Sequence, residues 1–295
     1  MCPEVIDLEE NIPFIRLTFD YMFKRVFTLN PELLKDFLVS VLKLDDNPKD
    51  SELIIENSEL TKSVRKEYRK TVDILVLLNG TKTIDIELNS STFNEIKYRN
   101  TLYIEKIMTT SIETGTSNRK MSDYYYYQLN LNIHKFKEDL GEKTFCFTEL
   151  NTGEILVENL KIIYKALDYY TELYYNKKGK VARDVIWLAL LNAKNYSELK
   201  ELSELIMDKK SKDKFLKDVR DASRDKFIIS EWESDKMAEL VKSEGIRYAE
   251  LEGREKEKVD NIKAMLENNA DYEFISKVSG KSIEEIKEIE KSMKD

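Results

Sequence analysis

One stretch of the sequence, TVDILVLLNGTKTIDIELN at 71–89, limits the fold more than any other. Two runs rich in Val, Ile and Leu flank Asn79-Gly80, a pair that favours the tight turn of a β-hairpin. Each run also contains an acidic residue, Asp73 in the first and Glu87 in the second. Burying a carboxylate among aliphatic side chains costs several kcal/mol unless it is paired, hydrogen-bonded or bound to a metal. The stretch therefore predicts a buried hairpin whose two acids have a specific partner.

The spacing about the turn places these two acids together. Asp73 and Glu87 are nearly symmetric about Asn79-Gly80, so we expect them to be close to cross-strand partners. The first strand is apolar on both faces except at Asp73, which indicates a central, covered position in a sheet. Strand alternation puts Glu87 and Asn89 on one face, ~7 Å apart. Because two adjacent carboxylates repel, a divalent-metal site is the preferred interpretation.

Composition restricts the chemistry available to such a site. The 295 residues, 41% hydrophobic and 35% charged, describe a soluble globular protein with room for a full core. Only two cysteines and no apolar run of ~18 residues favour a cytoplasmic protein that does not cross a membrane. The acidic N-terminal segment lacks the apolar region of a cleavable signal. His134 is the single histidine, so zinc sites and histidine triads are disfavoured and carboxylates, lysines or hydroxyls must act.

Charged residues precede the hairpin in two places. A helical pair is expected over 18–44, with Pro31 opening its second helix. Asp20 is expected to cap the first helix or to open its first turn, and Lys24 to be its partner one turn later. A short strand is expected over 53–56. The following run, TKSVRKEYRK, is either a solvated loop or a contact to the phosphate backbone of DNA. The basic residues of this run are Lys62, Arg65, Lys66, Arg69 and Lys70.

Further elements are expected after the hairpin. Apolar spacing predicts a helix over 93–114, with Gly115 as its C-terminal cap. Arg99 and Tyr103 are i, i+4 neighbours on this helix that either stack on its surface or face the site. A strand over 124–134 follows, whose tyrosines are expected to pack the sheet. Two runs about the turn signal NTGE, at 145–147 and 155–160, predict a hairpin that extends the sheet or covers its edge.

The order of these motifs resembles the Rpn family of recombination-promoting nucleases, often labelled PD-(D/E)XK nuclease family transposases. The resemblance covers residues 16–170, and its order is more specific than any single motif. It implies an α/β fold with a restriction-endonuclease-like core, a central mixed sheet flanked by helices, that cuts DNA with Mg²⁺, for which Mn²⁺ can substitute. It also implies that Asp73 and Glu87 are the metal-binding acids. The motifs that carry it are Asp20-x-x-Phe23-Lys24, Asp73, Ile86-Glu87-x-Asn89, Arg99-Asn100 and Tyr103.

Asn89 departs from the pattern of that family, which commonly has Gln where the wider superfamily has Lys. An amide can hydrogen-bond a water or a phosphate oxygen, but it supplies no charge and takes no proton. Activity would then depend on the metal and on a cation from elsewhere, for which Lys24, Lys97 and Arg99 are candidates. Two alternatives stay open: a catalytically inactive nuclease-like DNA- or protein-binding module, and a scaffold with paired carboxylates. Because no acidic trio for strand transfer is evident, "transposase" serves only as a label.

Beyond residue 164 the pattern becomes helical. We expect a nuclease domain over 1–175, a helical region over 176–232 and a charged helical tail over 233–295. The apolar stripes of the middle region predict helices over 181–191, 196–207 and 215–232.

The tail is expected to be one solvated helix followed by two short ones about Gly280, the second opened by a Ser282–Glu285 capping box. Seven acids and five lysines over 271–295 favour an interaction or stabilising tail over a helix-turn-helix reader of DNA. A homodimer through the helical C-terminal region is a further expectation, weakened by two glycines in the long helix.

Overall fold

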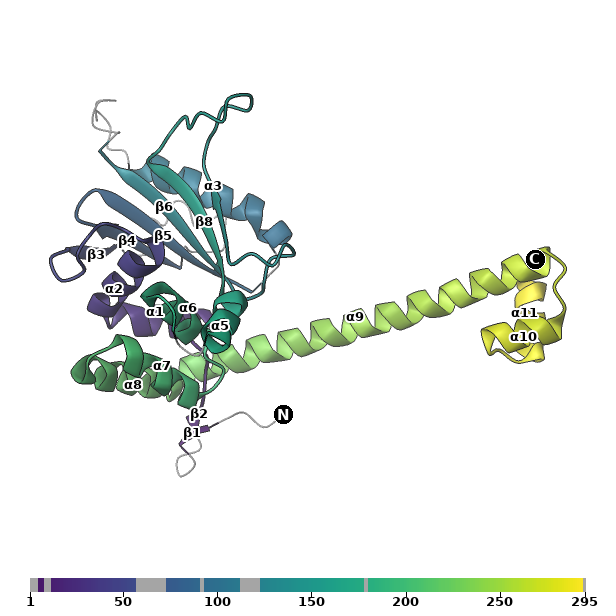
Figure 1. The fold of residues 1–295 in the computed structure, drawn as a ribbon. Coiled ribbons are helices and arrows are strands. Elements are labelled where there is room, and N and C mark those ends of the chain that lie inside the picture. The colour runs from purple at the N-terminus through teal and green to yellow at the C-terminus, as the bar shows by residue number, and fades with distance from the viewer. Residues whose placement is uncertain are drawn as a thin grey trace. The chain divides into compact units, whose positions relative to one another are not determined.

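A six-stranded mixed sheet forms the centre of the fold (Figure 1). The computed structural model describes residues 5–7, 12–56, 73–90, 93–111, 123–177 and 180–293. The strand order is β3-β4-β5-β6-β8-β7, with β5 and β8 parallel to β6 and the other neighbours antiparallel. The strands are β3 (Leu53–Glu56), β4 (Ile74–Leu78), β5 (Lys82–Asn89), β6 (Tyr125–Asn132), β7 (Glu142–Phe145) and β8 (Leu160–Ala166). A separate two-stranded pair consists of β1 (Val5–Asp7) and β2 (Ile12–Pro13).

The predicted hairpin is confirmed as β4 and β5. Asn79 and Gly80 both have positive φ, 52° and 66°, as expected for a tight turn with the right-handed twist of the strands. The register pairs Ile74 with Ile86 and is therefore centred on Gly80. Asp73 lies immediately before β4, so its predicted place inside the strand is wrong by one residue. The reason is local: its Oδ2 accepts the Leu88 amide at 2.7 Å, where a continued ladder would supply a backbone carbonyl.

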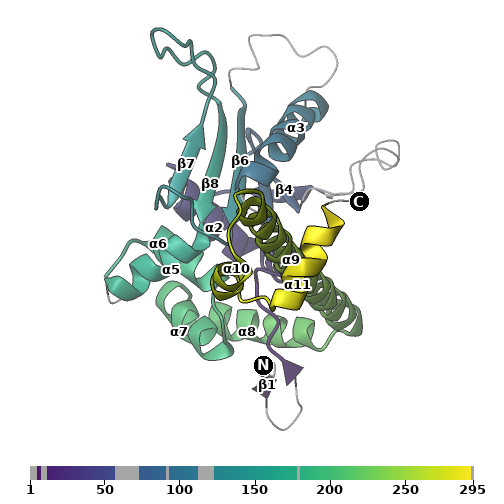
Figure 2. The ribbon, with the colours of Figure 1, turned by 90° about the vertical axis from the view of Figure 1, so that its right-hand side faces the viewer.

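Helices cover both faces of the sheet. In Figures 1 and 2, α3 lies on one face of the sheet, and α1, α2 and α6 lie toward the opposite face. The predicted helical pair is confirmed, with Pro31 as the first residue of α2. The helices of this unit are α1 (Asp20–Thr28), α2 (Pro31–Leu42), α3 (Phe93–Ser111), α5 (Leu167–Asn176), α6 (Arg183–Leu191), α7 (Tyr196–Ile206) and α8 (Lys209–Ser223). The predicted cap of α3, Gly115, lies outside the described residues.

Two predicted elements have different bounds in the structure. The helix expected over 215–232 is wrong, because α8 ends at Ser223 and α9 (Lys226–Glu267) begins three residues later. Asp225 causes the break, since its Oδ1 accepts the amides of Phe227 and Ile228 as an N-cap does. The hairpin about NTGE is present, but its second strand, β8, runs over Leu160–Ala166 rather than 155–160. The pairing of β8 with β6 explains the shift, because β8 is an inner strand and β7 is the edge.

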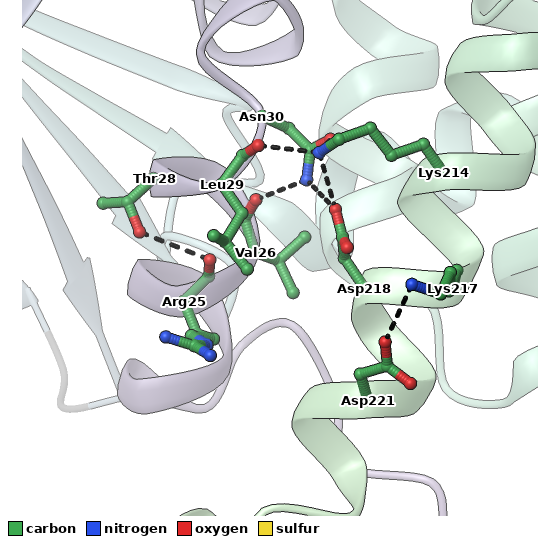
Figure 3. A network of polar contacts seen from close by, with 9 residues as sticks. All are labelled: Arg25, Val26, Thr28, Leu29, Asn30, Lys214, Lys217, Asp218 and Asp221. Carbon is green, nitrogen blue, oxygen red and sulfur yellow. Dashed lines mark hydrogen bonds and ion pairs between the residues drawn. The ribbon is translucent and has the colours of Figure 1, made fainter.

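A polar network joins the α1–α2 corner to α8, 184 residues later in the chain (Figure 3). Lys214 Nζ donates to the Leu29 carbonyl at 2.7 Å, to Asn30 Oδ1 at 2.7 Å and to Asp218 Oδ2 at 2.8 Å. The Asn30 amide, which is buried, donates to Val26 O and to Asp218 Oδ2. The nitrogen and the oxygen of the buried Asn30 amide are therefore both hydrogen-bonded, and these bonds connect the α1–α2 corner to α8.

The chain divides into two compact units, Met1–Ile229 and Ser230–Asp295. In the second unit, Ile262 of α9 packs with Ile275 of α10 (Tyr272–Ser279) and Ile286 of α11 (Ile283–Ser292). The predicted short helices and the capping box are confirmed, with Gly280 at φ 72° between them. Within the described ranges, no helix combines the length and apolar character needed to cross a bilayer.

Candidate active site

The two acids of the hairpin meet at the start of β4. Continuing the β4–β5 register by one residue places Asp73 opposite Glu87. Asp73 has 12% of its side chain exposed and Glu87 is 4% exposed, so both carboxylates are largely removed from water. The backbone of Asp73 hydrogen-bonds to the Glu87 carboxylate, and the Leu88 amide donates to Asp73. The hairpin backbone therefore holds one acid against the other.

Lys24 of α1 reaches this pair from below the sheet. Its Nζ lies 3.2 Å from Asp73 Oδ1 and 3.0 Å from Asp20 Oδ1. The predicted partnership of Asp20 and Lys24 is confirmed, and of the two predicted positions of Asp20 the structure has the first turn of α1 rather than the cap. Phe19 occupies the cap position of α1 without a side-chain hydrogen bond, and Asp20 is the first helical residue. The Asp20 carboxylate is free to face Lys24 because it does not fold back onto the helix amides.

Asp85 is a third buried carboxylate, two residues before Glu87 on the same face of β5. Its side chain has no exposed surface, and its Oδ2 accepts from Gln128 Nε2 at 2.9 Å. Its Oδ1 and Glu87 Oε1 are both buried without a hydrogen-bond partner among the described residues. Buried polar atoms of this kind are rare and point to a ligand, a water or a proton.

Burial dominates the electrostatics of these acids. It raises the pKa of Asp73 to about 6, to which the charge of Asp20 adds and which Lys24 opposes. It raises the pKa of Asp85 to about 7, against the hydrogen bond from Gln128. Burial, together with Asp85 and Asp73, holds the pKa of Glu87 well above its ordinary value, and Arg99 opposes the rise. Three carboxylates thus compete for too little positive charge, so a cation would be stabilised here.

The amide at position 89 is joined to a cation on α3. Asn89 is 2% exposed, and its Oδ1 accepts from Arg99 Nη2 at 2.6 Å. The guanidinium also lies 6.0 Å from the ring centre of Tyr103, and Arg99 Nε donates to Asn100 Oδ1 at 3.2 Å. Burial raises the pKa of Tyr103, and the nearby charge of Glu87 adds to the rise. Arg99 and Tyr103 therefore stack on each other and also face the acids. The two alternatives expected for this pair, stacking and facing the site, are both present.

A row of amides on β6 runs beside the acids of β5. The parallel register pairs Asp85 with Gln128 and Glu87 with Asn130, and all four are buried. Asn100 of α3 donates to Asn130 Oδ1, so the helix is attached to the sheet by a buried polar contact. Apolar contacts flank it, since Ile96 packs with Tyr164, and Ile104 with Tyr126.

Sequence reasoning missed this amide row, together with Asp85 as a member of the site. The signal was available as period-two amides at Gln128, Asn130 and Asn132 between the tyrosines and leucines of β6.

Other predicted residues lie elsewhere. Lys97 is on the opposite flank of α3 from Arg99, beside Tyr98. His134, 66% exposed, follows β6 with Nδ1 3.5 Å from Asp168. The predicted DNA-binding residues fall outside the described part of the chain; they are Lys62, Arg65, Lys66, Arg69 and Lys70.

The residues present fit a hard divalent cation held by few protein ligands. Asp73 and Glu87 supply facing carboxylate oxygens, of which Glu87 Oε1 is buried and unsatisfied. Within the described residues, no group of three or more His, Cys, Asp or Glu side chains is arranged to hold a metal. Mg²⁺ is commonly bound through one or two carboxylates, with waters and substrate phosphates completing its shell. Two acids are therefore sufficient for a cation that shares its ligands with a phosphate.

Comparison with known proteins gives one family. The family model described as PD-(D/E)XK nuclease family transposase matches residues 17–264, which include Asp20, Asp73, Asp85 and Glu87. No curated protein matches the chain, and no solved structure does.

Proposed function

The chain belongs to the PD-(D/E)XK nuclease family transposases, and from this premise we propose that it is a metal-dependent endonuclease that hydrolyses phosphodiester bonds in DNA. The observation that supports the proposal is the position of Asp73 opposite Glu87, both largely buried. Ionised carboxylates in such an environment require a compensating charge. Lys24 supplies part of it, and a divalent cation held by Asp73 and Glu87 would supply the remainder.

Asp73 and Glu87 would hold the metal, which we propose to be Mg²⁺, with Mn²⁺ able to substitute. When bound, the cation supplies a water of lowered pKa and stabilises negative charge on the phosphate. Hydrolysis joins the water oxygen to phosphorus and breaks the bond from phosphorus to the leaving oxygen. Where the wider superfamily has a lysine, and therefore a positive charge, this chain has the neutral amide of Asn89.

Asn89 and Arg99 act together in this proposal. The guanidinium of Arg99, held at 2.6 Å from Asn89 Oδ1, is a fixed cation beside Glu87. A guanidinium binds phosphate oxygens well because its planar donors match their geometry. Arg99 would therefore stabilise charge on the phosphate, Asn89 would hold Arg99 and position water or phosphate, and Tyr103 would support the guanidinium face. Asp20 and Lys24 would orient Asp73.

DNA is the proposed partner, and the cytoplasm the proposed compartment. The basic run at 61–70 leads directly into Asp73, so its five cations would contact the phosphate backbone next to the site. The description of the family as transposases links it to mobile elements, and recombination is the process that we propose this chain serves.

Two copies of the chain would act as a homodimer through the helical C-terminal region. Met237, Leu240 and Val241 of α9 are 62%, 58% and 63% exposed and occupy i, i+3 and i+4 positions. Such a stripe on a long helix is typical of one that pairs with another helix.

The second candidate function is a catalytically inactive module that binds DNA or protein. It is favoured by Asn89, because the residue that carries charge in the wider superfamily is replaced by a neutral amide.

Nicking of a supercoiled plasmid with Mg²⁺ or Mn²⁺ separates the two functions. We expect the wild type to nick the plasmid, Asp73→Asn and Glu87→Gln to lose nicking, and Glu105→Gln, an exposed acid of α3, to retain it. We also expect added Mn²⁺ to raise the melting temperature of the wild type and not that of Glu87→Gln. Equal nicking by the wild type and Asp73→Asn would refute the site. A wild type that is stabilised by Mn²⁺ but does not nick would establish the inactive module.

A further inference from the structure

Helix α3 has two flanks along the sheet, and only one of them faces the acids. Arg99 and Tyr103 lie on the flank toward Asn89 and Glu87. Lys97 and Thr101, two residues before and after Arg99, are turned by about 200° around the helix axis and lie on the other. This second flank faces the end of β7 and the inner strand β8.

A pocket of about 450 Å³ lies on this second flank. Its volume is within the range of small-molecule sites, roughly 300–1,000 Å³. The described residues that line it come from α3, from the end of β7 and from β8; they are Lys97, Tyr98, Thr101, Phe145, Cys146, Phe147, Leu160, Ile162 and Tyr164. None of these residues is acidic, although the chain carries 56 acids and a net charge of −8. Among the described residues that line this opening, a polyanion therefore meets no carboxylate.

Aromatic faces dominate the exposed wall of the pocket. Tyr98 is 75% exposed, Phe145 43% and Phe147 53%. Phe145 is fixed edge-to-face against Tyr164, with ring centres 5.8 Å apart, so part of the wall is preformed. Lys97 Nζ lies 5.1 Å from the ring centre of Tyr98 at the rim. Exposed rings beside a cation are the combination with which proteins bind single-stranded nucleic acid, because bases stack on the rings and the cation meets the backbone.

We propose that this pocket binds one unpaired base of the DNA substrate, with Phe147 and Tyr98 stacking on the base and Lys97 contacting an adjacent phosphate. The proposal rests on the proposed function in taking DNA as the ligand, and it adds a preference for single-stranded or unpaired DNA. Stacking on aromatic rings accepts any base, so the pocket would read strandedness rather than sequence.

Buried polar contacts connect the pocket to the acids. Tyr164, which lines the pocket, is hydrogen-bonded to Asn100. Asn100 in turn donates to Asn130, the parallel-strand neighbour of Glu87. Tyr98, on which the base would stack, immediately precedes Arg99, so α3 carries residues of both the pocket and the candidate active site.

The test uses the full chain in EDTA, so binding is measured without cleavage. The ligands are two labelled single strands about ten nucleotides long, one with all its bases and one with abasic sites at the centre. We expect the wild type to bind the complete strand about 5- to 150-fold more tightly, the range given by stacking of one base. Phe147→Ala and Tyr98→Ala should each remove most of this preference. Phe274→Ala removes an equally exposed phenylalanine, 53%, from α10 and should leave it unchanged.

Cys146 supplies a direct readout, because its exposed thiol lines the pocket and Cys2 is the only other cysteine. In a Cys2→Ser protein, the complete strand should slow the reaction of Cys146 with an aromatic disulfide reagent, and the abasic strand should not. Equal affinity of the wild type for both strands, or a loss in Phe147→Ala no larger than in Phe274→Ala, would overturn the proposal. So would protection of Cys146 by an apolar peptide and not by the complete strand. Plasmid nicking with metal is scored separately, so an active nuclease without base preference is distinguished from an inactive protein.

Discussion

Asn89 Oδ1 and Arg99 Nη2 lie 2.6 Å apart, so this neutral amide on β5 is hydrogen-bonded to a cation from another element. The charge that a lysine would bring on β5 is brought instead by α3. Because the Asn89 side chain is buried, this bond is shielded from water and holds the guanidinium in one place. The site can therefore keep a positive charge beside Glu87 without a lysine in the strand.

Arg99→Gln should lower the nicking rate by roughly 10²- to 10³-fold, the usual cost of removing one donor that stabilises transition-state charge. The melting temperature with EDTA should change little, because Asn89 can accept from Gln instead. Arg25→Gln, an exposed arginine of α1, is the matched control and should retain full activity. Full nicking by Arg99→Gln would assign the catalytic charge to Lys24 instead.

Asp85→Asn should raise the free energy of unfolding at alkaline pH in EDTA by roughly 1–3 kcal/mol, because the neutral amide buries no charge and its oxygen can still accept from Gln128. The pKa of Asp85 is raised from 3.8 to about 7 in the folded protein, so the folded state binds more protons than the unfolded state between these values. The stability that this group contributes is present below about 3.8 and is lost as the pH rises through about 7.

Chemical unfolding across this pH range measures the effect. The wild type should lose stability as the pH rises, and Asp85→Asn should lose less. Asp45→Asn, an exposed acid, should follow the wild type. Parallel curves for Asp85→Asn and the wild type would mean that the pKa of Asp85 is not raised in the folded protein.

Lys24→Met should destabilise the metal-free protein at neutral pH by roughly 1–3 kcal/mol, because Asp73 and Asp20 then face each other without a cation. Added Mn²⁺ should restore more stability to this variant than to the wild type, since it replaces part of the lost charge. Thermal melts with and without Mn²⁺ measure both terms. Lys49→Met, an exposed lysine, should behave as the wild type does; an equal loss in both variants would deny Lys24 a role in the site.

Ile286→Ala should destabilise the packing of α10 and α11 on the end of α9 by about 2–5 kcal/mol. The reason is that Ile286 is fully buried in the cluster with Ile262 and Ile275. Hydrogen exchange should accelerate over 271–293 and stay unchanged in the central sheet. Ile289→Ala, at a partly buried position beside the same cluster, should have a smaller effect. Uniform acceleration over the whole chain would show that the two units unfold together.

The sequence was sufficient to predict the hairpin, because its turn pair and its apolar runs act locally. Asn79 and Gly80 take the positive φ values that the pair favours, and the symmetry of the spacing brought Asp73 and Glu87 together. The helix break at Asp225 was not predicted, since the apolar stripe continues across it and a capping aspartate resembles any other charged residue.

The remainder of the site depends on contacts between distant segments. The parallel pairing of β5 with β6 places Gln128 beside Asp85, and no local signal gives the register of parallel strands. The contact of Asn100 with Asn130 likewise depends on which face of the sheet α3 covers. Lys24 and Arg99 were candidates with equal standing in the sequence, whereas the structure pairs one with Asp73 and the other with Asn89.

The register of β5 has a consequence for how the chain can change by insertion and deletion. Ile84 and Ile86 face the helical layer, while Asp85 and Glu87 face α3, so one strand carries core and site on alternate residues. Losing or gaining one residue within β5 would exchange the two sets, placing carboxylates in the apolar layer and isoleucines under Arg99. Inserting or deleting one residue in this strand should therefore abolish both folding and activity. The turn at Gly80 can lengthen without moving the isoleucines or the carboxylates to the other face.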